Sequence, residues 1–451
     1  MVNFVIVSYL GTDIGVISYD DNANVFPFQF TKEYLDLNID LSPMHMPASL
    51  GQKIYAFPEL NYSTFKSLPG FVADSLPDDF GNSILDAWMA RNGRTKPITP
   101  LERLQFTGSR GMGALEFRPA NTVFKHDSPS DIELESLIRV AQDVLANRMN
   151  TSVLLDGSDD EQAMKTLLAV GTSAGGARPK AVLAFNDDFS RVLSGQVDVP
   201  EGFTHYLMKF DGIDKKHHKD FGNSLGYSAT EYCYYQMAVN SGILMEKCLL
   251  LDEGHRRHFL TKRFDRDGNK KIHVQTLTGI AHVDYNKPGI YSYEQLFDIA
   301  RQLRLPREDA EQLFKRMAFN VIAENNDDHS KNFAFIYENN RWRLSPAYDM
   351  AFAYNPESDW VGQHWMSVNG KRSDITIDDL MSVGTNVTRL GHSFLKESIE
   401  QVIDSVNMWP SLAKEQDVPK HLRDFMDPRI DMSKFSKPRV HIDIHEPDID
   451  F

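Results

Sequence analysis

The sequence predicts an α+β protein of two lobes, with an additional β-rich subdomain at the N-terminus and a mainly helical C-terminal lobe. Residues 2–30 alternate apolar and polar side chains around turn residues, which is the pattern of short strands. Helical periodicity begins at residues 131–147 and dominates from Ser292 onward. These changes of pattern predict three parts: residues 1–125 as the N-terminal β-rich subdomain, residues 126–262 as the small lobe and residues 263–451 as the helical large lobe.

Composition indicates a globular protein without a membrane segment. The chain has 451 residues, of which 41% are hydrophobic, and this is enough to bury at least one large core. Acidic residues outnumber basic ones by 63 to 48, and the formal charge of -15 argues against a broad surface for nucleic-acid phosphates. No apolar run could cross about 30 Å of hydrocarbon, and the first ten residues lack the pattern of a signal peptide. We therefore expect a cytoplasmic protein.

The β-rich subdomain is expected to extend to FTGSRGMGALEFRP, residues 106–119. Gly108, Gly111 and Gly113 punctuate a strand-like run in this stretch. A nucleotide-binding loop would need a helix start directly after the glycines, and none follows. We interpret these glycines as bends of a hairpin.

The small lobe is expected to contain a helix, a glycine-containing loop and two strands, followed by a second helix. The acidic stretch 156–161 is a linker or a helix entry, and SAGGARPK, residues 173–180, follows it. HYLMKF, residues 205–210, is strand-like, and the pattern of residues 228–241 is helical. The only cysteines are too few for a disulfide framework or a thiolate zinc site, so we expect both in the core: Cys233 and Cys248.

Residues 257–277, RHFLTKRFDRDGNKKIHVQTL, predict a hairpin with Asp267 and Gly268 at its turn. A calcium loop is the alternative for this acidic turn. The later ligand positions of such a loop, including its terminal Glu, are missing here, so the hairpin is favoured.

The stretch NNDDHSKNFAFIYENNRWRLSPAYDM, residues 325–350, contains the residues that we expect to carry out catalysis. Two strand-like runs, 333–337 and 341–344, flank turn residues, so we expect them to form a hairpin that reverses the direction of the chain. The return would bring Asp349 beside Asn332 and Asp327. Kinase-type phosphoryl transfer needs this set, because one carboxylate accepts the proton of the attacking hydroxyl, while an Asn oxygen and a second carboxylate hold magnesium.

A polar turn rich in Asn and Asp is the alternative, and two further features favour the kinase interpretation. The glycine-containing loop ends at Lys180 and can bring backbone N–H groups and a cation against phosphates, although it is not a Walker sequence. Lys209 ends an apolar strand run, where an unpaired cation would be costly to bury. Glu231 on the following helix is its expected partner.

These motifs carry a family resemblance. SAGGARPK, HYLMKF, KRFDR, NNDDHSKN and SPAYD occur in the order seen in the HipA family, the serine/threonine-protein kinase toxins of bacterial HipA-HipB modules. LPDDFGN and GSRGMGALEF resemble the N-terminal part of the same family, so the similarity covers nearly the whole chain. The resemblance implies a protein-kinase-like fold that uses ATP and Mg2+.

The resemblance also implies roles for individual residues. Asp327 corresponds to the catalytic base and Lys209 to the phosphate-binding lysine. Asn332 and Asp349 are the expected metal ligands. Ser173 matches the loop serine whose phosphorylation ejects the loop and silences the kinase. The remaining expected ATP-binding residues come from the glycine loop, the connection between lobes and the catalytic stretch: Gly175, Gly176, Ala177, Arg178, Pro179, Lys180, Lys262, Arg263, Phe264, His329, Ser330, Lys331 and Tyr348.

Two positions depart from the family pattern. Pro179 fixes φ and deletes a donor in the last turn of the glycine loop, which bears on the ejection of that loop. Asp328 adds a second carboxylate next to the expected base. Either Asp327 or Asp328 could be the base on residue type, and the spacing to Asn332 favours Asp327.

By resemblance, the partner would be a small HipB-like helix-turn-helix antitoxin, with DNA contacted mainly through it. The substrate would be a cellular protein, an aminoacyl-tRNA synthetase being the precedent in the family, and its phosphorylation would inhibit translation and growth. Two other classes stay open: a catalytically inactive kinase fold acting as a co-repressor or scaffold, and a kinase of small molecules. The complete set of Lys209, Asp327, Asn332 and Asp349 argues against the inactive class.

Overall fold

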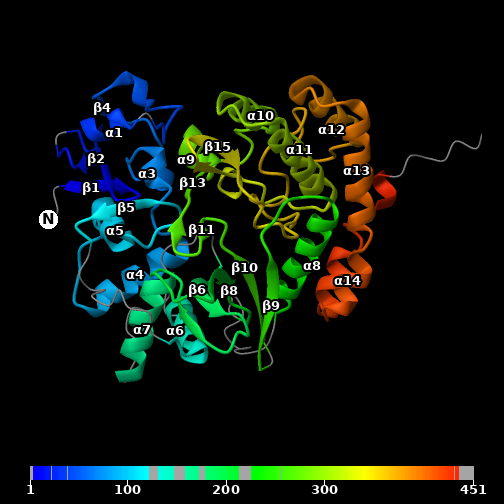
Figure 1. Cartoon of the computed structure of the whole chain (residues 1–451). Coiled ribbons are helices and arrows are strands. Elements are labelled where there is room, and N and C mark those ends of the chain that lie inside the picture. The colour runs from blue at the N-terminus through cyan, green and yellow to red at the C-terminus, as the bar shows by residue number, and fades with distance from the viewer. Residues whose placement is uncertain are drawn as a thin grey trace, which may run out of the picture.

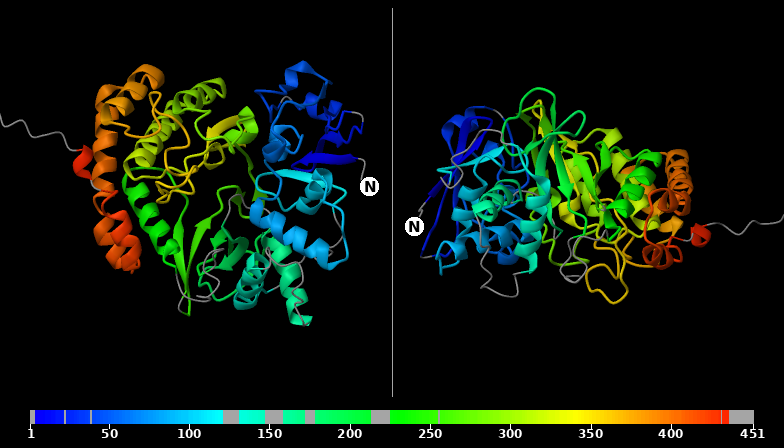
Figure 2. Two further views of the ribbon diagram at one scale, coloured as in Figure 1. Left: turned by 180° about the vertical axis from the view of Figure 1, so that it is seen from behind. Right: turned by 90° about the horizontal axis from the view of Figure 1, so that it is seen from below.

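The computed structural model describes residues 4–120, 131–146, 158–171, 178–212 and 225–435, apart from residues 22, 38, 255 and 431. It has three parts: the N-terminal subdomain and the large lobe lie side by side in Figure 1, and the small lobe lies below them. Seen from below (Figure 2), the N-terminal subdomain is at one end of the molecule and the C-terminal helices are at the other. No helix in the described ranges is long and apolar enough to cross a membrane.

The N-terminal subdomain is built on a five-stranded antiparallel sheet with the order β4-β3-β2-β1-β5. Alternate residues of β1, such as Val5 and Val7, are fully buried, as expected for a sheet with one face on a core. Its strands are β1 (Phe4–Tyr9), β2 (Thr12–Ser18), β3 (Phe28–Phe30), β4 (Ile54–Tyr55) and β5 (Leu115–Arg118). Its helices are α1 (Lys32–Asp36), the 3-10 turn η1 (Ala48–Leu50), α2 (Tyr62–Phe65), α3 (Gly70–Ala73) and α5 (Pro100–Thr107).

The small lobe is a second five-stranded antiparallel sheet, ordered β7-β6-β8-β10-β9. Its strands are β6 (Lys180–Asn186), β7 (Val192–Ser194), β8 (Phe203–Lys209), β9 (Cys248–Glu253) and β10 (Arg256–Lys262). Three helices complete it: α4 (Asp79–Arg91), α6 (Leu134–Ala146) and α7 (Ser158–Gly171). Phe80 of α4 shares an apolar cluster with Leu167 of α7 and Leu183 of β6. The packing therefore crosses the boundary predicted at residue 125, and the domain limits stay a prediction.

The large lobe is mainly helical and carries the small sheet β13-β14-β15 (Figure 1). Its helices are α8 (Tyr227–Asn240), α9 (Leu277–Ala281), α10 (Tyr293–Gln302), α11 (Arg307–Ile322), α12 (Ile377–Val383), α13 (His392–Val406), α14 (Trp409–Glu415) and α15 (Lys420–Met426). Its strands are β11 (Arg266–Asp267), β12 (Lys270–Lys271), β13 (His273–Thr276), β14 (Ala334–Glu338) and β15 (Arg341–Leu344). Short turns are η4 (Ser330–Asn332), the π-helical η5 (Gly384–Thr388) and η6 (Met432–Phe435).

One apolar core runs through both the N-terminal subdomain and the large lobe. It includes Phe71 of α3, Ile280 of α9 and Phe319 of α11. Polar contacts reinforce this junction, because Asp74 accepts hydrogen bonds from the backbone N–H of Thr276 (2.6 Å) and from its hydroxyl (2.7 Å). The N-terminal subdomain is therefore packed against the lobe that contains residues 325–332, which we call the catalytic stretch.

Most predicted elements are confirmed, but the hairpin predicted around Gly108, Gly111 and Gly113 is wrong, because these glycines connect α5 to β5 and β5 pairs with β1. The helix predicted at 228–241 is α8, and the hairpin after Asn332 is β14 and β15. Its turn residues Asn339 and Asn340 adopt φ of 52° and 58°, which Asn tolerates better than most residues. Both cysteines are free and buried, as predicted.

The hairpin predicted over residues 257–277 is much shorter than expected. Only Arg266–Asp267 and Lys270–Lys271 pair with each other. The apolar run before them is β10, which pairs with β8 and β9 and contributes Leu260 to the small-lobe core. Residues 262–264 therefore lead from the small lobe to the large lobe, and we call them the hinge.

Candidate active site

Lys209, at the end of β8, lies between two carboxylates. Its Nζ hydrogen-bonds Glu231 Oε1 on α8 and Asp349 Oδ1 on the segment after β15. Burial alone would lower the pKa of Lys209, but Asp349 and Glu231 outweigh it and hold the pKa above its ordinary value. The predicted pairing of Lys209 with Glu231 is confirmed, and the lysine also ties β8 to Asp349.

Lys180 brings a second buried cation to the same place. It begins β6 and is the antiparallel partner of Lys209 in the sheet. Its Nζ lies 4.0 Å from Asp78 Oδ2, at the start of α4. Burial lowers the pKa of Lys180 and raises that of Asp78 to about 7. Asp349 is also in the electrostatic field of Lys180.

Asp349 is held as a carboxylate at the junction of the two lobes. Burial alone would raise its pKa, but the charges of Lys209 and Lys180 hold the pKa below its ordinary value. Its φ of 52° is in the left-handed region, where Asp is tolerated better than most side chains. The segment before it is fastened to the catalytic stretch, because Tyr348 donates from its hydroxyl to the carbonyl of Lys331 (2.6 Å).

Asp327 is the catalytic-stretch carboxylate that reaches the solvent. Its side chain is 39% exposed. Its Oδ1 accepts a hydrogen bond from Trp360 Nε1 (2.6 Å) and lies 3.6 Å from His329 Nε2. Burial raises the pKa of Asp327, while His329 and Trp360 oppose that shift and Asp349 adds to it. A carboxyl with a raised pKa is a better proton acceptor than an ordinary one.

Asp328 has a different environment from its neighbour. Its carboxylate is fully buried and accepts three hydrogen bonds, from the Tyr293 hydroxyl (2.8 Å), from His364 Nδ1 (3.1 Å) and from the backbone N–H of Trp365 (2.7 Å). This carboxylate therefore fastens the stretch to α10 and to residues 364–365. The geometry favours Asp327 as the group that can meet a substrate.

The other residues of the catalytic stretch also differ in whether their side chains can contact a ligand. Asn332 donates from Nδ2 to the carbonyl of Asp327 (2.8 Å), so its Oδ1 is the atom that can face a cation. Ser330 is fully buried and shares a hydrogen bond with the Thr278 hydroxyl (2.7 Å). Lys331 extends over the ring of Tyr285, with 4.6 Å from Nζ to the ring centroid.

The oxygen donors fit a magnesium site of the kinase type. Asn332 Oδ1 and the Asp349 carboxylate are hard ligands, and magnesium bound to a nucleotide takes its other ligands from phosphates and water. No group of three or more His, Cys, Asp or Glu residues that could hold a metal occurs among the described residues. Two protein oxygens would leave the other positions around magnesium to phosphates and water.

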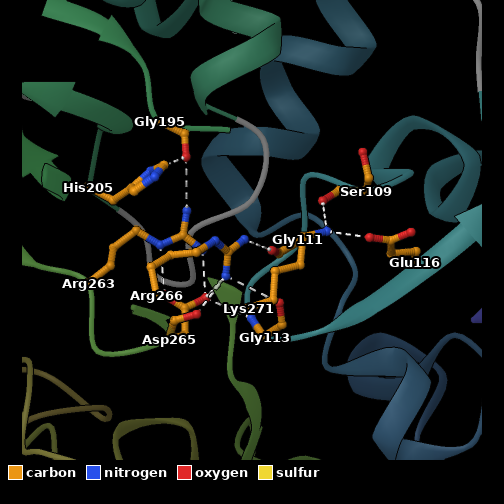
Figure 3. Close-up of polar contacts among 10 residues, drawn as sticks. All are labelled: Ser109, Gly111, Gly113, Glu116, Gly195, His205, Arg263, Asp265, Arg266 and Lys271. Carbon is orange, nitrogen blue, oxygen red and sulfur yellow. Dashed lines mark hydrogen bonds and ion pairs between the residues drawn. The ribbon is translucent and has the colours of Figure 1, made fainter. Parts of the chain in front are cut away.

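The expected adenine-side residues are not all directed toward this site. Phe264 lies against Tyr348, with ring centroids 5.7 Å apart. Lys262 is half exposed, with its Nζ 3.8 Å from Glu246 Oε2. Arg263 is buried, and its guanidinium binds Asp265, which directly follows the hinge, so only the main chain of Arg263 could contact a nucleotide (Figure 3).

The glycine loop is described only at its end. Ser173, Gly175, Gly176 and Ala177 lie outside the described residues. Arg178 stacks on Tyr227, with its Cζ 4.7 Å from the ring centroid, and its Nη1 is 4.0 Å from Glu231 Oε2. The Pro179 carbonyl accepts from the backbone N–H of Phe210 (3.1 Å), so this proline extends the pairing of β6 with β8. The loop thus ends beside the carboxylate that binds Lys209.

Comparison with known proteins identifies the family. The family model for the HipA-like C-terminal domain matches residues 172–410, and the model for the HipA N-terminal domain matches residues 5–118. The chain belongs to the HipA family. The serine/threonine-protein kinase toxin HipA of Shewanella oneidensis is 22% identical to it over 359 residues, which cover 75% of this chain and 72% of that protein.

A solved structure shares the fold over almost the whole length. HipA of Shewanella oneidensis MR-1, in a structure described as the complex of HipA, HipB and operator DNA, superposes with a TM-score of 0.64 at 18% identity. The match covers 94% of this chain and 95% of that chain. The predicted family, the α+β kinase-like fold and the enzyme class, a serine/threonine-protein kinase, are therefore confirmed.

The sequence analysis missed two residues that contact the candidate active site. Asp78 lies in LPDDFGN, which we used only to establish the family resemblance, and it approaches Lys180 from the start of α4. Trp360, which donates to Asp327, lies 33 residues after it in a segment without regular structure. The motif around Asp78 was a usable signal, whereas nothing in the sequence marks Trp360.

Proposed function

We propose that the protein is an ATP- and Mg2+-dependent serine/threonine-protein kinase that acts as the toxin of a type II toxin-antitoxin module. The observation that supports this most strongly is Lys209, which joins the helix carboxylate of Glu231 to Asp349. Protein kinases need an ion pair between a strand lysine and a helix glutamate, together with a metal-binding aspartate nearby, and Lys209 lies against both of the corresponding carboxylates.

In the proposed reaction, each group has one task. Asp327 accepts the proton of the attacking serine or threonine hydroxyl, and burial, by raising its pKa, makes it a stronger base. Lys209 and Lys180 neutralise phosphate charge, and Arg178 approaches from the glycine loop. Asn332 and Asp349 would hold Mg2+, which supplies charge neutralisation and alignment of the phosphates when bound.

Lys209 can take a phosphate oxygen as a further partner when nucleotide binds. In this structure two carboxylates share its ammonium group, which leaves a third N–H for phosphate, and a phosphate oxygen would weaken the contact with Asp349. Magnesium bound to Asp349 would compensate that carboxylate for the weakened contact. Nucleotide and metal are therefore expected to bind cooperatively.

Regulation and partners are proposed from the family. Autophosphorylation of Ser173 would inactivate the enzyme, because a phosphate at the glycine loop repels those of the nucleotide. A HipB-like helix-turn-helix antitoxin is the proposed partner, with DNA contacted mainly through it, as the described composition of the Shewanella oneidensis complex supports. The proposed substrate is a cytoplasmic protein, an aminoacyl-tRNA synthetase being one candidate, whose phosphorylation would inhibit translation and growth.

Incubation with ATP labelled on its γ-phosphate tests the proposal against its two alternatives. The purified protein is incubated alone and with cell extract, and Asp327→Asn protein serves as the control. Label on protein, lost in the control, supports the proposed kinase. Label on a small molecule would favour a metabolite kinase, and absence of turnover would favour an inactive co-repressor or scaffold.

A further inference from the structure

A buried carboxylate directly after the hinge holds three parts of the molecule together (Figure 3). Asp265 is completely buried. Its Oδ1 accepts from Arg263 Nε (2.7 Å), and its Oδ2 accepts from Arg263 Nη2 (2.6 Å) and Arg266 Nη1 (2.8 Å). Burial alone would raise the pKa of Asp265, but the two guanidinium groups hold it below its ordinary value. Asp265 is therefore a fixed anion between two cations.

The N-terminal subdomain supplies the fourth contact of this carboxylate. The backbone N–H of Gly113 donates to Asp265 Oδ2 (2.8 Å). Arg266 donates back to the carbonyls of Gly113 and Gly111, both at 3.3 Å. A parallel contact lies beside these, where Lys271 Nζ binds Glu116 Oε1 (2.6 Å). Residues 111–113, which we call the glycine latch, thus bind directly to the segment that follows the hinge.

The fit of the glycine latch leaves no room for a side chain at Gly113. Its φ is 76°, and a Cβ built there would lie 2.9 Å from the backbone nitrogen of Val274, on β13. A contact this short with backbone forces the latch or β13 to move. The position of the latch is therefore set by close packing as well as by hydrogen bonds.

The small lobe is attached to the same cluster through Arg263. The backbone N–H of Arg263 donates to the carbonyl of His205 on β8 (3.0 Å), and its Nη1 is 3.5 Å from the carbonyl of Gly195. β8 ends four residues later at Lys209. Any movement of Asp265 would thus be transmitted to the small-lobe sheet and to the hinge.

We propose that Asp265 is a positioning residue through which the N-terminal subdomain sets the affinity of the active site for nucleotide. This inference rests on the proposed kinase function. Phe264, directly before Asp265, packs against Tyr348 at the expected adenine edge. The glycine latch fixes Asp265, Asp265 fixes Arg263 and Arg266, and the hinge between the lobes is held at the spacing that nucleotide binding requires.

The test compares two glycines that share a backbone conformation. Gly113→Ala strains a positive φ and also displaces the latch. Gly93→Ala, in the turn after α4, strains a φ of 77° with nothing within 4 Å of the new Cβ. Loss of one hydrogen bond to a buried charge changes an equilibrium constant by about tenfold or more. We therefore expect Gly113→Ala to raise the KM for ATP and the Kd for magnesium-ATP about tenfold, with kcat within about twofold, and Gly93→Ala to change neither.

A double-mutant cycle separates positioning from general destabilisation. Asp265→Asn alone should also weaken magnesium-ATP binding by at least about tenfold, and adding Gly113→Ala to it should change the Kd by less than about twofold. The inference would be overturned if the effects of Asp265→Asn and Gly113→Ala on the Kd for magnesium-ATP multiply in the double variant. It would also be overturned if Gly113→Ala protein binds nucleotide as well as Gly93→Ala protein does. If Gly113→Ala does not fold, Arg266→Lys takes its place in the cycle, because it keeps the charge and shortens the reach to Gly111 and Gly113. Wild-type protein that fails to bind magnesium-ATP would instead reject the proposed function itself.

Discussion

Replacement of Lys209 by methionine separates its two roles, in phosphoryl transfer and in stability. Methionine keeps most of the apolar stem but removes the ammonium group from Glu231 and Asp349. Glu231 then stays buried, and Arg178 Nη1 lies 4.0 Å from its Oε2. Breaking a buried ion pair from one side costs about 3–5 kcal/mol, so the variant should unfold at a clearly lower temperature.

The effect on catalysis has a separate cause and a separate size. In the proposed reaction, the Lys209 ammonium group stabilises the negative charge that develops on the phosphates in the transition state. Its loss should raise the activation free energy by about 1.4–4 kcal/mol, which lowers turnover by about tenfold to a thousandfold. Labelled ATP measures the turnover, and calorimetry measures nucleotide binding. The double variant Lys209→Met/Glu231→Gln also removes one of the two carboxylates that lost their partner, so it should regain part of the lost stability but none of the activity.

Two results would refute this reasoning. If Lys209→Met turns over within about threefold of wild type, the lysine does not contact phosphate. If the double variant regains activity together with stability, the loss in the single variant came from unfolding, and the lysine is only a structural partner of Glu231.

The remaining predictions concern the catalytic stretch and the glycine loop. Asp328→Asn should lower the unfolding temperature, because three hydrogen bonds to a buried charge are weakened, whereas Asp327→Asn should unfold at the temperature of wild type. If calorimetric scans show the reverse order, Asp327 is the structural carboxylate and Asp328 is the base. Trp360→Phe removes a hydrogen bond that lowers the pKa of Asp327, and activity needs that carboxyl ionised. The acid limb of kcat/KM against pH, already above the usual Asp range of about 3.9, should therefore move to still higher pH; an unmoved limb would exclude Asp327 as the titrating base. Ser173 should carry phosphate in wild-type protein incubated with ATP, and not in Asp327→Asn protein made without another kinase; mass spectrometry that finds phosphate in both, or in neither, would contradict self-inactivation.

Local sequence signals predicted those parts of the site that depend on neighbouring elements. The end of a strand and the start of the next helix bring Lys209 and Glu231 together, and alternation in β8 with the periodicity of α8 was enough to pair them. The hairpin β14–β15 carries the chain back toward the catalytic stretch, and its Asn-Asn turn could be predicted from residue type.

Contacts between distant segments were not predictable in this way. Asp78 meets Lys180 only because α4 packs on α7 in the small lobe, although it lies in the N-terminal part of the chain. The guanidinium of Arg263 turns from the nucleotide side because Asp265 is two residues away and buried. Asp327 and Asp328 are equivalent in residue type, and although the spacing to Asn332 favours Asp327, only the structure shows that Asp328 is bound by Tyr293 of α10. Periodicity predicts which face of an element is buried but not which remote side chain it meets.

The most direct test of the central claim is γ-phosphate transfer by Asp327→Asn protein whose nucleotide binding has been measured in parallel. The amide keeps the size of the side chain and can still receive the Trp360 hydrogen bond, but it cannot accept the substrate proton. The account predicts magnesium-ATP affinity close to that of wild type and a loss of label transfer to protein of about a hundredfold or more, the usual contribution of a general base. Label transfer close to the wild-type rate by a protein that binds nucleotide normally would contradict it.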